Sequence, residues 1–156
     1  LRHFGAPRVT QLVRERLERA FSAAGMRAEH HCVFLNRMSQ SQFVAAAGLC
    51  DVFLDSIGWS GGNSALECLP QALPIVTLDG ATMRGRHSAA ILRMIDVTDT
   101  IAATVDDYVA IATRLGQDTQ FRQTMSSRMA ENRHRLYGDR APVTALENFL
   151  EGAVRG

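Results

Sequence analysis

The chain has 156 residues, of which 46% are hydrophobic and 21% are charged, a balance typical of one globular domain that buries a core. Its 17 basic and 16 acidic residues almost cancel, and only 6% of the residues are aromatic, so a nucleic-acid partner is not indicated. The longest stretch with little charge, Ser56 to Pro74, contains glycine, serine, asparagine and Glu67, which excludes it as a membrane span.

Every basic residue counted above is an arginine, so Schiff-base chemistry and a phosphate-loop lysine are excluded. An anion must instead be bound by arginine, backbone N–H groups or a helix N-terminus. The three cysteines, Cys32, Cys50 and Cys68, are too few and too far apart for a disulfide framework or a zinc cluster, and we expect them to be reduced core residues. The chain starts at Leu1 without a signal peptide, which predicts a cytoplasmic setting and a piece of a longer protein.

Hydrophobic periodicity predicts alternating helices and strands over the first half of the chain. Ser39 is the expected N-cap of the second helix. In chain order, the expected elements are a helix over Arg8–Ala24, a strand over Cys32–Leu35, a helix over Ser39–Gly48, a strand over Asp51–Asp55, a helix over Asn63–Ala72 and a strand over Pro74–Leu78.

The second half of the chain is predicted to be mostly helical, with helices over Arg86–Met94, Val105–Leu115, Asp118–Arg135 and Pro142–Val154. Alternating strands and helices predict an α/β fold, a Rossmann-like doubly wound parallel sheet in a single domain over residues 1–156. Leu1–Phe4 is a candidate remnant of a fourth strand, and Val143–Val154 is expected to pack back on the domain as a terminal helix.

Two loops follow the carboxyl ends of predicted strands, where parallel sheets bind ligands. In the first loop, Asp55 to Glu67, glycines such as Gly61 let the backbone approach a ligand, and the helix start offers N–H groups to a phosphate. Glu67 lies one turn into this helix and is suited to bind two ribose hydroxyls. The alternative is a capping box, in which Ser64 and Glu67 only satisfy the helix start.

The second loop, Asp79 to Ser88, carries two arginines and His87 before another helix. These residues suit a diphosphate, and the alternative is a solvated basic loop. Trp59, in the first loop, either lines the ligand cleft or anchors the loop as a buried side chain, and the buried anchor is the expected role.

The order of these blocks resembles the C-terminal catalytic lobe of the O-GlcNAc transferase and SPINDLY glycosyltransferases, and it is closest to their bacterial members. The resemblance runs from Phe34-Leu35-Asn36-Arg37-Met38 to Arg140 and is carried by Asp51-Val52-Phe53-Leu54-Asp55-Ser56-Ile57-Gly58-Trp59-Ser60-Gly61-Gly62-Asn63-Ser64-Ala65-Leu66-Glu67, Leu73-Pro74-Ile75-Val76-Thr77 and Met83-Arg84-Gly85-Arg86-His87. It implies the C-terminal half of a GT-B enzyme, an inverting transfer from a UDP-sugar, usually UDP-GlcNAc, to serine or threonine of a protein, and no metal cofactor.

The resemblance also implies site residues. The family's diphosphate contacts fall on Gly62, Asn63 and Ser64, its ribose carboxylate falls on Glu67, and the backbone of Met38 matches its base-binding segment. The animal enzymes have a His-Thr-Thr trio at 62–64, an aspartate at 67, and a lysine and a histidine at Gln40 and Phe43.

Because the family's lysine is absent, Arg37 or Arg86 is expected to supply the positive charge. These departures leave the sugar open between GlcNAc and fucose. The family's acid/base groups, acceptor groove and tetratricopeptide repeats are expected upstream of Leu1, so a protein acceptor would bind there and this piece would be inactive alone. A regulatory module that binds a nucleotide or anion without transferase activity fits the same loops.

Overall fold

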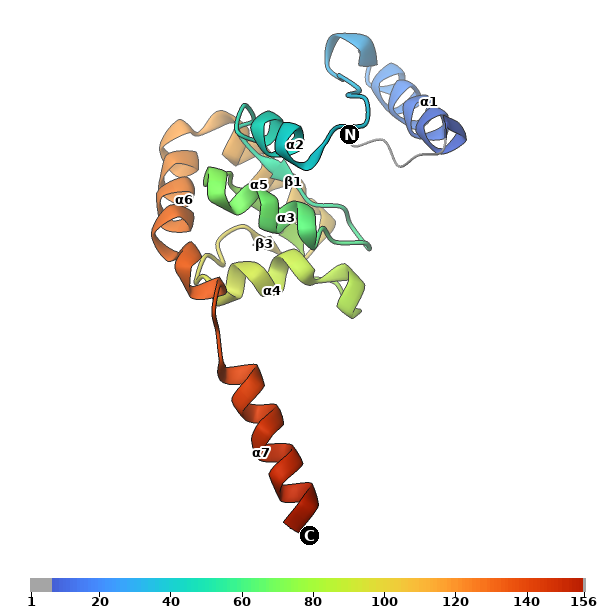
Figure 1. Cartoon of the computed structure of the whole chain (residues 1–156). Coiled ribbons are helices and arrows are strands. Elements are labelled where there is room, and N and C mark those ends of the chain that lie inside the picture. Colours follow the sequence, from blue (N-terminus) through green and yellow to red (C-terminus); the bar gives the residue numbers. More distant parts are fainter. Residues whose placement is uncertain (1–6, 156) are drawn as a thin grey trace. The chain divides into compact units, whose positions relative to one another are not determined.

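The computed structural model describes residues 7–155, so the candidate strand at Leu1–Phe4 lies outside the described residues. The chain divides into two compact units, Leu1–Ala45 and Ala46–Gly156, and each is described by itself. The elements labelled in Figure 1 are α1 (Pro7–Ala23), α2 (Gln40–Ala47), β1 (Phe53–Leu54), α3 (Asn63–Cys68), β2 (Ile75–Leu78), α4 (His87–Met94), β3 (Ile101–Ala102), α5 (Val105–Gln117), α6 (Thr119–Asn132) and α7 (Ala141–Arg155). Short 3-10 helices cover Ala28–His30, Leu69–Gln71, Met83–Gly85 and Arg133–Leu136.

In the first unit, the predicted helix is present as α1, but the predicted strand over Cys32–Leu35 is wrong, because these residues form no strand. The apolar run is not covered on both faces, because Val33 is 78% exposed. Phe34 packs instead under the guanidinium of Arg14, whose Cζ lies 4.0 Å from the ring centroid. A short apolar run is therefore a weak strand signal when its side chains contact a neighbouring helix.

Ser39 begins α2 as predicted. Its Oγ accepts a hydrogen bond from the backbone N–H of Gln42 at 3.3 Å, and its own N–H donates to Oε1 of Gln42 at 2.9 Å. The two residues form a capping box that satisfies N–H groups at the start of the helix.

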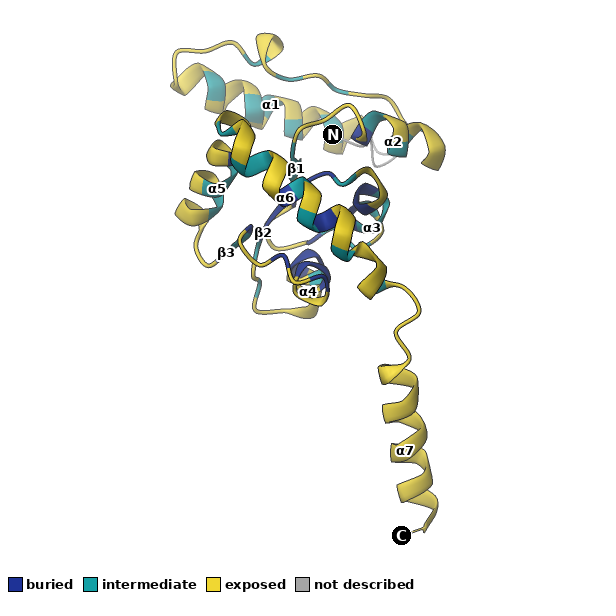
Figure 2. Ribbon diagram, turned by 90° about the vertical axis from the view of Figure 1, so that its left-hand side faces the viewer, coloured by how far each residue is buried: buried dark blue, intermediate teal, exposed yellow. Residues whose placement is uncertain are grey.

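The second unit holds a parallel sheet in the order β1-β2-β3. Phe53 pairs with Ile75 and Thr77 pairs with Ile101, both in parallel register, which confirms the expected parallel arrangement for β1 and β2. The third strand is β3, which the sequence did not predict, because its two residues, unlike those of β1, do not lie in a run of large apolar side chains. Figures 1 and 2 agree that α3 lies on one side of these strands and α5 on the other, so helices cover both faces of the sheet.

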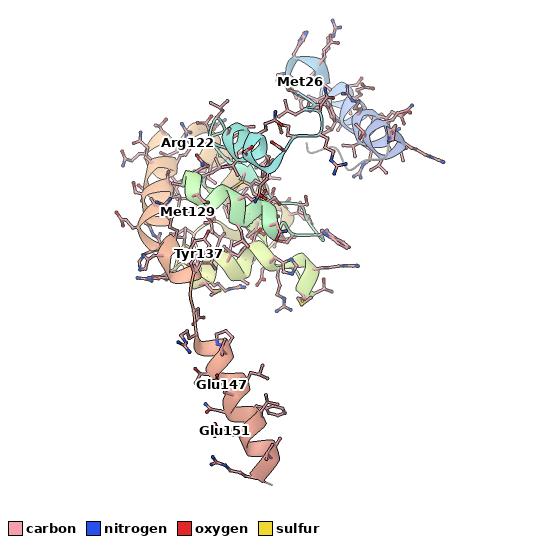
Figure 3. All side chains as sticks on the ribbon, in the orientation of Figure 1. Met26, Arg122, Met129, Tyr137, Glu147 and Glu151 are labelled. Carbon is pink, nitrogen blue, oxygen red and sulfur yellow. The ribbon has the colours of Figure 1, made fainter. Side chains whose placement is uncertain are left out.

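The core lies between this sheet and its helices, and its members are fully or almost fully buried. It comprises Ala65, Leu69, Ile75, Val76, Ile91, Leu92, Ile95, Val97, Leu115, Met125 and Met129. Figure 3 labels Met129 on α6, the helix that closes this core together with α5. Thr104 begins α5 with a capping box to Asp107, and Asp118 begins α6 by accepting the N–H of Phe121. Sheet and helices therefore fix the loops at the carboxyl ends of β1 and β2.

The three cysteines are free, but only Cys68 is a core residue. Cys50 is exposed and Cys32 is partly exposed, so the expectation that all three are buried is wrong. Burial raises the pKa of the Cys68 thiol to about 11, which keeps it protonated near neutral pH.

The C-terminal helix α7 is present, but the prediction that Val143–Val154 packs back on the domain is wrong. All residues of α7 are exposed, as Figure 2 shows by colour, and Phe149 is 70% exposed. Glu147 and Glu151 lie one turn apart on the same helix (Figure 3). The apolar spacing of the helix is real, but the described residues of the chain do not bury it.

Candidate functional site

The glycine-rich turn after β1 leads directly into α3. Gly58 has a φ of 83°, a left-handed conformation that favours glycine. A Cβ on Gly61 would lie 2.7 Å from Oγ of Ser64 and 3.3 Å from Oδ1 of Asp55, so a side chain here would have to displace these two polar groups. The turn thus leads directly into the start of α3, and the predicted binding of a phosphate by its N–H groups stays a prediction.

Asp55 organises this turn, although the sequence analysis gave it no site role. It follows β1, is 4% exposed, and its carboxylate accepts hydrogen bonds from three groups. The Oγ of Ser60 and the Oγ1 of Thr77 donate to Oδ2 at 2.7 and 2.6 Å, and the N–H of Gly61 donates to Oδ1 at 2.7 Å. An acidic residue at the end of an apolar strand and before a Gly-Gly turn was the available signal.

The second loop is tied to the first. The backbone N–H of Ser60 donates to the carbonyl of Arg84 at 2.8 Å, and the N–H of Ser88 donates to Oγ of Ser60 at 2.9 Å. Nδ1 of His87 lies 3.8 Å from the position that a Cβ on Gly62 would take. The starts of α3 and α4 are therefore neighbours, and the two predicted loops form one region of the surface.

The two arginines of the second loop have different surroundings. Arg86 is exposed and donates to the carbonyl of Ala81 at 2.8 Å, while Cζ of Arg84 lies 5.5 Å from the ring centroid of Trp59. A third arginine, Arg93 on α4, donates from Nη2 to Oδ2 of Asp79, the residue after β2, at 2.6 Å. This hydrogen bond holds the pKa of Asp79 below its usual value. Arg84 and Arg86 thus place positive charge beside the glycine-rich turn, whereas Arg93 connects α4 to the residue after β2.

Glu67 lies inside α3 and not at its cap. The helix begins after Gly62 without a side-chain hydrogen bond to its N-terminus, so the capping-box alternative for Ser64 and Glu67 is wrong. The Oε2 atom of Glu67 is buried and has no hydrogen-bond partner in the described part of the chain. A buried, unpartnered carboxylate oxygen is costly in a folded protein unless a ligand or solvent satisfies it.

Trp59 is 69% exposed, so the expected role as a buried anchor is wrong. Ser60 anchors the loop instead, because its side chain is 2% exposed and is hydrogen-bonded to Asp55. The indole is accessible beside the glycine-rich turn.

The predicted site residues fall in two groups. Gly61, Gly62, Asn63, Ser64, Glu67 and Arg86 come together in the second unit. Arg37 and Met38 belong to the first unit, where Arg37 is exposed and Met38 is partly buried. Their predicted roles toward a base or a diphosphate stay predictions.

A hollow of about 170 Å³ lies at the amino ends of β1 and β2, the end of the sheet opposite to the glycine-rich turn. Arg122 of α6, labelled in Figure 3, is among its lining residues. Its Nη1 donates to the carbonyl of Leu115 at 2.8 Å, and its Nε lies 3.5 Å from Asp51. Because this guanidinium is already engaged, the hollow does not compete with the glycine-rich turn as an anion site.

Tyr108 on α5 also contacts Asp55, through the backbone of that residue. Its hydroxyl donates to the backbone carbonyl of Asp55 at 2.8 Å. Burial, with a smaller contribution from the charge of Asp55, raises the pKa of the phenol from 10.0 to about 12.

We expect this shift to make the protein less stable at alkaline pH. The unfolded chain loses the Tyr108 proton near pH 10 and the folded chain near pH 12, so the contribution of Tyr108 is present below pH 10 and is lost between these values. Urea unfolding of wild type and Tyr108→Phe over this range tests the prediction. The difference between the two proteins should shrink as the pH rises, and a constant difference would contradict the shift.

Among residues 7–155, no group of three or more histidine, cysteine, aspartate or glutamate residues is placed to hold a metal ion. The same part of the chain contains no helix that is both long and apolar enough to cross a membrane.

Comparison with known proteins identifies similar sequences and a similar structure. Residues 8–138 match the family described as Glycosyl transferase family 41. The chain is 29% identical over 120 residues to the UDP-N-acetylglucosamine--peptide N-acetylglucosaminyltransferase of Caenorhabditis elegans, which covers 76% of this chain and 10% of that protein. It is 25% identical over 107 residues to the probable UDP-N-acetylglucosamine--peptide N-acetylglucosaminyltransferase SPINDLY of Hordeum vulgare, covering 69% of this chain and 11% of that protein.

A solved structure of a Thermobaculum terrenum O-GlcNAc transferase mutant superimposes with a TM-score of 0.73 at 31% identity. The match covers 90% of this chain and 26% of that one. The chain therefore spans about a tenth of these two curated relatives and about a quarter of the solved chain.

Proposed function

Because the chain belongs to Glycosyl transferase family 41, we propose that it is the donor-binding lobe of an inverting, UDP-GlcNAc-dependent protein O-glycosyltransferase. The observation that carries the proposal is Glu67, one turn beyond a glycine-rich helix start, whose buried Oε2 atom has no hydrogen-bond partner among residues 7–155. A nucleoside diphosphate has ribose hydroxyls for this carboxylate and phosphates for the N–H groups of the turn.

In this proposal, Gly62, Asn63 and Ser64 bind the diphosphate through backbone N–H groups and short polar side chains. Gly61, whose own N–H donates to Asp55, lets the backbone approach the donor closely. Glu67 accepts the ribose hydroxyls. Arg86 is exposed in the adjoining loop and supplies positive charge to the leaving diphosphate, since the chain has no lysine. Arg37 and Met38 are assigned to the base side of the donor.

Charge neutralisation by arginine and by N–H groups stabilises a leaving diphosphate directly, so the proposed reaction requires no metal ion. In this proposal the acceptor protein binds to other segments of the full-length protein, where tetratricopeptide repeats would recruit it. The proposed setting is cytoplasmic. The relatives named above carry UDP-N-acetylglucosamine in their names, which supports GlcNAc as the sugar over fucose.

Saturation-transfer NMR of the full-length protein with UDP, UDP-GlcNAc and GDP-fucose tests the proposal. We expect signal transfer to UDP and UDP-GlcNAc and none to GDP-fucose. A preference for GDP-fucose would assign the other sugar. Binding of UDP without transfer from UDP-GlcNAc to any peptide would favour a regulatory nucleotide-binding module, and binding of none of the three would reject a donor site.

A further inference from the structure

We propose that Asp55 is a positioning residue of the donor site, which holds the glycine-rich turn and the start of α4 in one fixed arrangement. The inference rests on the proposed donor binding and assigns a role to a residue that binds no ligand itself. Asp55 is 4% exposed and Ser60 is 2% exposed, so neither side chain is accessible to a nucleotide.

The contacts form a closed ring of hydrogen bonds through four residues, Asp55, Ser60, Ser88 and Gly61, here called the Asp55 ring. Ser60 Oγ donates to Asp55 at 2.7 Å and accepts the N–H of Ser88 at 2.9 Å. Ser88 Oγ donates to the carbonyl of Gly61 at 3.0 Å, and the N–H of Gly61 donates to Asp55 at 2.7 Å. One carboxylate thus connects the turn before α3 to the first turn of α4.

The position of the ring explains why it matters for an anion. Gly61 immediately precedes Gly62, the N-cap of α3, and Ser88 immediately follows His87, whose ring lies beside Gly62. A small shift of the ring therefore moves both helix starts relative to one another. Binding groups that are held in place before the ligand arrives lose less entropy and keep their geometry, whereas loose ones lose affinity.

A purely structural role for Asp55 is the alternative, and Thr77 allows the two to be separated. Thr77 donates to the same carboxylate oxygen at 2.6 Å, but it lies on β2 and outside the ring. Ser60→Ala opens the ring, while Thr77→Val removes one hydroxyl from the same carboxylate and leaves the ring closed. Each variant removes one buried hydroxyl that donates to Oδ2 of Asp55, and urea unfolding is the check that both proteins are folded.

Two measurements on the full-length variants complete the test. The first is amide hydrogen exchange at Ser88 without ligand, which should be faster in Ser60→Ala than in Thr77→Val because only the former loses the acceptor of this N–H. The second is affinity for UDP and for uridine by calorimetry. We expect Ser60→Ala to bind UDP about tenfold more weakly than Thr77→Val, with equal uridine affinities in the two variants.

Equal UDP affinities in the two variants would overturn the proposal, as would a parallel loss of UDP and uridine binding. Absence of UDP binding in the wild type would instead reject the proposed function and, with it, the role of Asp55 in donor binding. Exchange at Ser88 would still report whether the ring exists, so the two failures are distinguishable.

Discussion

Glu67→Ala is expected to weaken UDP binding by about 1.5–3 kcal/mol, the usual contribution of a hydrogen bond to a charged group. The free energy of unfolding should stay unchanged or rise, because the substitution removes a buried carboxylate oxygen without a partner in the described part of the chain and places alanine inside α3. Calorimetry with UDP and urea unfolding on the same protein measure both effects.

Two further variants give the controls for this experiment. Glu67→Gln retains one carbonyl acceptor and should cost less affinity than alanine. Glu147→Ala removes an exposed carboxylate from α7 and should leave UDP affinity unchanged. If Glu67→Ala bound UDP like wild type, the carboxylate would have no part in a donor site, and the strongest support for the proposed function would be lost.

Gly80→Ala should lower the free energy of unfolding by about 2–3 kcal/mol. Gly80 follows β2, and a Cβ there would lie 2.5 Å from the carbonyl oxygen, 2.8 Å from the carbonyl carbon and 2.9 Å from the Cα of Gly85. All three contacts are backbone atoms, so no side-chain rotation relieves them. Urea or guanidinium unfolding measures the change.

Gly116→Ala is the matched control, because Gly116 lies in α5 and a Cβ there would meet nothing within 4 Å. Alanine is a better helix former than glycine, so this variant should gain about 0.5–1 kcal/mol. Both variants replace glycine by alanine, but the expected changes in the free energy of unfolding have opposite signs. A Gly80→Ala protein as stable as wild type would show that the loop before α4 readily changes its backbone.

Much of the second unit could be predicted from the sequence. Pro74–Leu78 is an apolar run between turn residues, so the central strand β2 was recognised almost to the residue. In the first unit, the structure confirms the predicted cap at Ser39, and in the second unit Asp118 is an ordinary capping residue at the start of α6. Local sequence patterns were sufficient for these elements, because an apolar run between turn residues or a serine or aspartate before a helix has one common structural role.

The predictions that failed depended on contacts that no local pattern contains. Val33 and Phe149 are apolar at suitable spacings, yet both are mainly exposed, because the burial of an apolar face depends on what else lies nearby. Asp55 was passed over for a related reason. Its three donors are Gly61, Ser60 and Thr77, and Thr77 is 22 residues away on another strand.

The two outer strands of the sheet, β1 and β3, contain two residues each, whereas the four-residue β2 is paired on both sides. Within residues 7–155, an incoming strand from another molecule would therefore find a ladder of only two residues on either side. So short an edge gives too few backbone hydrogen bonds to template strand addition, which is how many natural sheets avoid aggregation. The shortness of β1 and β3 is therefore expected to hinder edge-to-edge pairing of the sheet with another copy.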